Sequence, residues 1–155
     1  MKRTFFILLS LISFTTYAQL PSLNKKVIEY VNTVIGKKVD KGECWDLANN
    51  ALRFAKAKWN GEYIFGKEVN PKKDTIYPGD LIQLENVFVE YTKDGMQWKE
   101  QFPHHTAIVY EVTATGEYKI ANQNTSQTGR KVGITEFRIK DVKKGKLTFY
   151  RPTNK

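Results

Sequence analysis

The apolar and polar positions of the chain separate a helical first part from a strand-rich second part. Apolar residues recur at the spacing of one helix face from Leu23 to Val34, and again from about Lys41 to Lys58. At the start of the second segment, Asp40 and Glu43 are typical of a capping box. This pattern predicts two amphipathic helices and places Cys44 in the first turn of the second one.

The remainder of the chain shows the shorter alternation of β-strands. Between residues 60 and 78, glycine, proline and lysine interrupt every period, which predicts a surface loop. After that loop, strands are expected at residues 80–84, 87–91, 96–102, 105–112, 118–122, 132–137 and 147–151. Helices followed by a strand meander predict an α+β domain, in which N-terminal helices pack on an antiparallel sheet of about five to six strands.

The first 18 residues have a different character from the rest. Lys2 and Arg3 precede an apolar run over residues 5–14, and Ala18 offers a small residue for cleavage before Gln19. A basic start, a short apolar stretch and a small residue are typical of a secretory signal peptide. We therefore expect export to the periplasm, cell envelope or exterior, and a single mature domain over residues 19–155 with no membrane span.

The charge of the mature chain indicates its partners. Removal of Lys2 and Arg3 lowers the formal net charge from +9 to +7, because 23 Lys and Arg remain against 16 Asp and Glu. A basic surface attracts polyanions. In an exported protein these are anionic envelope polymers rather than nucleic acid, and we expect a monomer acting on them.

Cys44 is the only cysteine of the chain, so no internal disulfide can form. A thiol at a helix N-terminus lies at the positive end of the helix dipole and beside free backbone N–H groups, which lower its pKa and can hold an oxyanion. Nucleophilic cysteine catalysis also requires a histidine and a group that orients it. The position of Cys44 therefore favours a catalytic role over an inert thiol.

The chain has two histidines, His104 and His105, which adjoin in one expected strand and so face opposite sides of the sheet. If Thr115 and Gly116 close a two-residue hairpin, residues whose numbers sum to 231 pair. His105, Asn122 and Asn124 then share one face, and His104 does not join them. This register favours His105 as the base and Asn124 as its neighbour, unless a bulge shifts the pairing.

These residues resemble the cysteine, histidine-dependent amidohydrolase/peptidase (CHAP) family, within the NlpC-type cell-wall hydrolases. Three segments carry the resemblance in the family's order. They are Gly42-Glu43-Cys44-Trp45-Asp46-Leu47-Ala48, Pro78-Gly79-Asp80-Leu81-Ile82 and His105-Thr106-Ala107-Ile108-Val109. A fourth, Ile120-Ala121-Asn122-Gln123-Asn124, is similar to the family's Glu-x-Asn segment, with Asn122 where an orienting glutamate is common.

The resemblance implies a papain-like fold and hydrolysis of amide bonds, typically in peptidoglycan. Cys44 would attack the carbonyl, His105 would act as base and then acid, and no cofactor or metal would be needed. The family pattern implies Asn122 as the orienting residue, whereas the hairpin register favours Asn124, so both remain candidates.

Several alternatives accompany this interpretation. Trp45, Asp46 and His104 are candidates for the walls of the substrate cleft, and a metal site is disfavoured because adjacent strand histidines point apart. The same catalytic set would serve a secreted protease or an antibacterial effector. The missing glutamate also keeps open a non-catalytic envelope-binding module on this fold.

Overall fold

The computed structural model describes residues 20–154, so the expected signal peptide lies outside the described residues. Two helices come first, α1 (Ser22–Val34) and α2 (Cys44–Ala55). The strands that follow are β1 (Lys67–Val69), β2 (Leu81–Lys93), β3 (Met96–Ala114), β4 (Glu117–Asn122), β5 (Gly133–Arg138) and β6 (Val142–Arg151). The predicted α+β class is confirmed.

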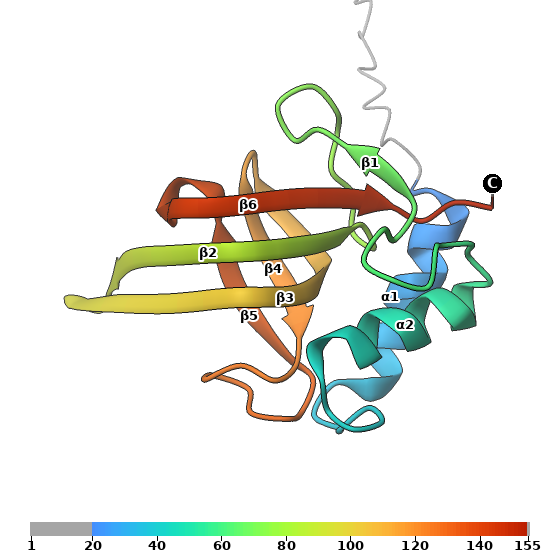
Figure 1. Cartoon of the computed structure of the whole chain (residues 1–155), viewed down its shortest axis with the longest axis horizontal. Helices are drawn as coiled ribbons and strands as arrows, with labels where there is room; N and C mark the ends of the chain where they lie inside the picture. The colour runs from blue at the N-terminus through green and yellow to red at the C-terminus, as the bar shows by residue number, and fades with distance from the viewer. Residues whose placement is uncertain (1–19, 155) are drawn as a thin grey trace, which may run out of the picture.

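The strands form one six-stranded sheet in the order β1-β6-β2-β3-β4-β5, and every neighbouring pair is antiparallel. Figure 1 shows both helices at one end of this sheet, while β2 and β3 run away from them as a long hairpin. The helices and the sheet are joined by an apolar core that includes Val27, Leu47 and Ile108. A second core lies on the other face of the sheet and includes Ile82, Val109 and Phe149.

The strands are longer than the alternation predicted. The segments expected at 80–84 and 87–91 are one strand, β2, and those at 96–102 and 105–112 are one strand, β3. Asn86 lies in β2 with a φ of 51°, and the pairing of β2 with β6 shifts just after it. The interruption in the pattern is therefore a bulge inside a strand and not a loop between two strands.

Two further boundaries differ from expectation. The second helix begins at Cys44, where Glu43 is the N-cap and its N–H donates to Asp46 Oδ2 at 2.9 Å, so the capping box joins Glu43 and Asp46 and not Asp40 and Glu43. The segment 60–78, expected as a loop, contains the short strand β1.

The turn before β2 is anchored by Asp80. Its buried carboxylate accepts hydrogen bonds from Arg151 at 2.9 and 3.1 Å and from the Asn24 amide at 2.8 Å. At the preceding residue, Gly79, φ is 85° and an added Cβ would lie 2.5 Å from the Asn24 carbonyl oxygen. The turn thus requires glycine for both conformation and space, and Asp80 ties α1, β2 and β6 together.

Candidate active site

Cys44 is the first residue of α2, and its thiol is half-buried against β3. Burial raises the pKa of this thiol above its ordinary value. The nearby backbone N–H groups of Thr106 and Trp45 oppose that rise, and the nearby carboxylate of Glu43 adds to it. The lowering expected from the helix N-terminus is therefore outweighed by desolvation, and the resting sulfur is a thiol.

The influence of the Thr106 N–H on the Cys44 thiol locates the sulfur beside β3, the strand that carries both histidines. Val109 exchanges backbone hydrogen bonds with Gly79 and Asp80, so its N–H and C=O point toward β2. Because these groups alternate along a strand, the N–H of Thr106 points to the opposite side, toward β4. β4 ends at Asn122, which leaves the Thr106 N–H free for Cys44 Sγ. The sulfur thus adjoins the peptide bond between His105 and Thr106.

The start of α2 is held against the sheet by the segment that follows β4. The buried side chain of Gln123 donates to the Glu43 carbonyl at 2.7 Å and bonds the backbone of Val39 in both directions at 3.2 Å. Asn124 donates to one Glu43 carboxylate oxygen at 2.7 Å, and Arg130 donates to the other at 2.6 Å. These bonds fix the helix end that carries Cys44.

His105 lies on the sheet face that points away from the helices, with Ala107 and Val109. It is only 5% exposed, its ring packs on Phe102 with centroids 5.1 Å apart, and its Nε2 is buried without a hydrogen-bond partner. Burial lowers the pKa of His105 from 6.5 to about 4, and the adjacent His104 lowers it in the same direction. The imidazole is consequently neutral at physiological pH, as a general base must be.

Asn122 lines the same pocket as His105, whereas Asn124 does not. Beside the site, β3 and β4 pair with residue numbers summing to 229, as in Ile108 with Ala121, because two irregularities intervene between there and the turn. The idealised register of 231 is therefore wrong at the site. Asn124 follows the end of β4 with a φ of 63°, and its amide points to Glu43.

The buried amide of Asn122 donates to the Thr135 hydroxyl at 3.0 Å and to the Ile120 carbonyl at 3.2 Å. Those bonds fix the side chain in the pocket that His105 also lines. Its role as the residue that orients His105 stays a prediction.

The three expected cleft residues have different surroundings. His104 is exposed, and its ring lies 4.0 Å from that of Tyr63 between centroids. The ring of Trp45 contacts Trp59 at 5.8 Å. Asp46 is buried, and its carboxylate accepts the Glu43 N–H. His104 and Trp45 thus take part in aromatic contacts, with Tyr63 and Trp59 respectively, while Asp46 caps the helix.

Sequence reasoning did not identify Gln123 and Arg130 as residues that hold the start of α2, where Cys44 lies. The only local signal was the place of Gln123 between two candidate asparagines, since a glutamine in a strand extension is otherwise unremarkable in sequence. Within residues 20–154, no group of three or more His, Cys, Asp or Glu side chains could hold a metal ion. No helix in the same range is long and apolar enough to cross a membrane.

A helix carrying a cysteine against an antiparallel sheet that presents a histidine defines a papain-like fold. The comparisons agree, because residues 19–155 match the model of the AIM3/BBC1 cysteine proteinase-fold domain, and the chain belongs to that family. No match was found among curated proteins.

Two solved structures share the fold. The crystal structure of Ly7917 is 16% identical with a TM-score of 0.51, covering 82% of this chain and 62% of that one. Ly7917 with the hydrolyzing product of MDP is 17% identical with a TM-score of 0.51, covering 83% and 63%. This chain therefore spans less than two thirds of the length of Ly7917.

Proposed function

We propose that the protein is an exported, CHAP-like cysteine hydrolase that cleaves amide bonds in peptidoglycan. One observation carries the proposal: the sulfur of Cys44, the only thiol of the chain, lies near the backbone N–H of Thr106, the residue that follows His105. The main chain at His105 therefore lies close to the proposed nucleophile, which supports the pairing of a thiol with a neutral base that covalent catalysis requires.

The reaction would proceed through a thioester. His105 takes the thiol proton through Nδ1, because its Nε2 is buried in the pocket. The thiolate then adds to the amide carbonyl carbon, and the N–H of Cys44 at the start of α2 helps to hold the oxyanion. The C–N bond breaks as the protonated His105 returns the proton to the leaving amine. Water, deprotonated by His105, then hydrolyses the thioester and regenerates the thiol.

Two further observations support peptidoglycan as the substrate. The similar structure Ly7917 was solved with the hydrolyzing product of MDP. Residues 19–155 also carry a net positive charge, since 23 Lys and Arg remain against 16 Asp and Glu. A basic surface favours adsorption to an anionic wall polymer.

The test is digestion of purified peptidoglycan followed by mass spectrometry of the released muropeptides. Wild type should produce new amine and carboxyl ends, while Cys44→Ala and His105→Ala should each lose at least about 10³-fold in rate. His104→Ala is the matched histidine variant and should stay within about tenfold of wild type. Casein cleavage without muropeptide release would instead assign a secreted protease.

The strongest competing function is a non-catalytic envelope-binding module. It is favoured by the raised thiol pKa and by Asn122, whose amide group donates to Ile120 and Thr135. A module of this kind would bind peptidoglycan equally well as wild type and as Cys44→Ala and would release no muropeptide. Cosedimentation with insoluble peptidoglycan, run beside the digestion, separates the two functions.

A further inference from the structure

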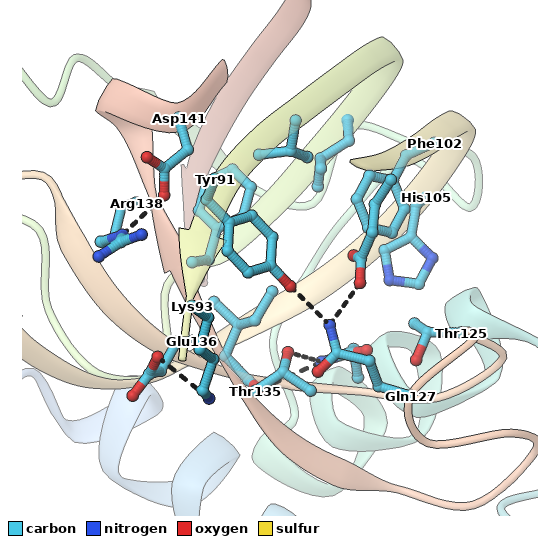
Figure 2. A pocket seen from close by; sticks show the side chains of 16 residues that line it. Tyr91, Lys93, Phe102, His105, Thr125, Gln127, Thr135, Glu136, Arg138 and Asp141 are labelled. Carbon is cyan, nitrogen blue, oxygen red and sulfur yellow. Dashed lines mark hydrogen bonds and ion pairs between the residues drawn. The ribbon is translucent and has the colours of Figure 1, made fainter. Parts of the chain in front are cut away.

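A pocket borders His105 on the sheet face away from the helices, and we call it the His105 pocket. One wall comes from the β2–β3 hairpin, through Tyr91, Glu100 and Phe102, and the other from β5 and the loop after β4. Figure 2 shows Gln127 reaching from that loop toward Tyr91. Gln127 donates to the Glu100 carboxylate and, at 3.5 Å, to the Tyr91 hydroxyl.

The charges around the pocket leave one carboxylate without a cation. Lys93 pairs with Glu136 at 3.6 Å, and Arg138 pairs with Asp141 at 2.6 Å, so these four side chains neutralise one another. Glu100 forms no ion pair with any residue of the described chain and accepts a hydrogen bond from the neutral amide of Gln127. The pocket therefore carries a net negative charge, although the protein as a whole is basic.

His105, which also lines the pocket, lacks a hydrogen-bond acceptor rather than a cation. If Nδ1 of His105 accepts the thiol proton, the neutral imidazole carries its hydrogen on Nε2. That Nε2 is buried without an acceptor, which is costly unless a ligand supplies one. The lining of the pocket also includes the apolar side chains of Leu84, Val89 and Phe137.

We propose that the His105 pocket binds a substrate residue whose aliphatic side chain ends in a primary ammonium group. The ammonium pairs with Glu100 beside the rings of Tyr91 and Phe102, the methylene groups contact the apolar lining, and a carbonyl oxygen of the residue accepts from His105 Nε2. This inference rests on the proposed function, since it names the substrate group bound next to the catalytic base.

Gln127 occupies the place that the ammonium would take. With Gln127 among its lining residues, the cavity measures about 40 Å³, which is room for only a few water molecules. A charged donor binds a carboxylate more strongly than a neutral amide does. The ligand ammonium therefore displaces Gln127 from Glu100, and the exposed Gln127 side chain moves into solvent.

Binding can be tested without turnover in the Cys44→Ala protein. The probes are Nα-acetyl-lysine methylamide and its Nε-acetylated form, titrated by NMR with the Gln127 side-chain amide as reporter. The free amine should bind at least tenfold more tightly than the acetylated form, and Glu100→Gln should abolish that preference. Glu90→Gln is the matched control, because Glu90 lies on the opposite face of the same hairpin and bonds Gln97 and Lys99.

The outcomes separate this inference from the proposed function. Equal binding of the two probes, or a preference that survives Glu100→Gln, would overturn the amine site whether or not the protein is a hydrolase. Conversely, loss of muropeptide release in Cys44→Ala tests the hydrolase alone. If both hold, acetylating the substrate amine should raise KM about tenfold in wild type and leave kcat nearly unchanged, and Glu100→Gln should remove that difference.

Discussion

The buried His105 should make the protein sensitive to acid in a definable pH range. Its pKa is lowered from 6.5 to about 4 in the folded protein, whereas an unfolded chain would restore the ordinary value. Between these two values the unfolded state binds more protons than the folded state. The free energy of unfolding therefore falls as the pH drops from about 6.5 to about 4.

The size of the effect follows from the shift. Each pKa unit corresponds to about 1.4 kcal/mol. Titration of His105 should therefore lower the free energy of unfolding by between about 2 and 3 kcal/mol at pH 4.5 relative to pH 7.5. Urea unfolding of wild type and His105→Gln at both pH values isolates this contribution, because carboxylates titrate alike in the two proteins. His104→Gln, which removes the exposed neighbour, serves as the control and should lose as much stability on acidification as wild type or slightly less, because His104 lowers the pKa of His105.

Between pH 7.5 and pH 4.5, the free energy of unfolding of wild type should thus fall by between about 2 and 3 kcal/mol more than that of His105→Gln. Equal losses in the two proteins would refute the reasoning, since they would mean that His105 is solvated or protonated in the folded state. A steeper loss in His104→Gln than in wild type would contradict it as well, because removing that positive neighbour should ease protonation of His105.

Two further predictions concern the thiol and the Asp80 anchor. Because burial raises the pKa of Cys44, iodoacetamide should alkylate the folded protein more slowly at pH 7 than the urea-unfolded protein. The alkylation rate of the folded protein should still be rising with pH at pH 9. A rate that is level above pH 7 would show a thiolate at rest. Arg151→Met should lower the free energy of unfolding by about 3 kcal/mol, because it leaves the buried Asp80 carboxylate without its cation, and Arg151→Met with Asp80→Asn should recover part of that loss. A loss below about 1 kcal/mol in urea unfolding of Arg151→Met would show that Asn24 and the backbone suffice for Asp80.

The sequence determined the class of fold because helix and strand periods differ strongly, and the alternation around His105 correctly separated the faces of the two histidines. It failed where one irregular residue decides the geometry. The bulge near Asn86 could not be distinguished from a loop, and the irregularities between β3 and β4 shifted the register by two residues. The end of β4 at Asn122 was not predictable either, and beyond it Asn124 turns toward Glu43. Local patterns contain no information on such offsets, since they arise from the packing of the whole sheet.

The electrostatics of the site were also only partly predictable. A helix N-terminus indicated an acidic thiol, but the desolvation that opposes it depends on how closely α2 approaches β3. That approach is set by Gln123, whose partners Val39 and Glu43 lie 84 and 80 positions away in the chain. Contacts at this separation leave no periodic trace in the sequence.

The length of β4 governs where the sulfur of Cys44 can lie against the sheet. Had this strand continued by one residue in the same register, the main chain at position 123 would have reached the backbone donor of residue 106 and closed the sheet there. Because the strand ends at Asn122, the N–H of Thr106 faces the sulfur of Cys44 instead. Lengthening this one strand by a residue would therefore displace the sulfur of Cys44 without changing any side chain of the proposed site.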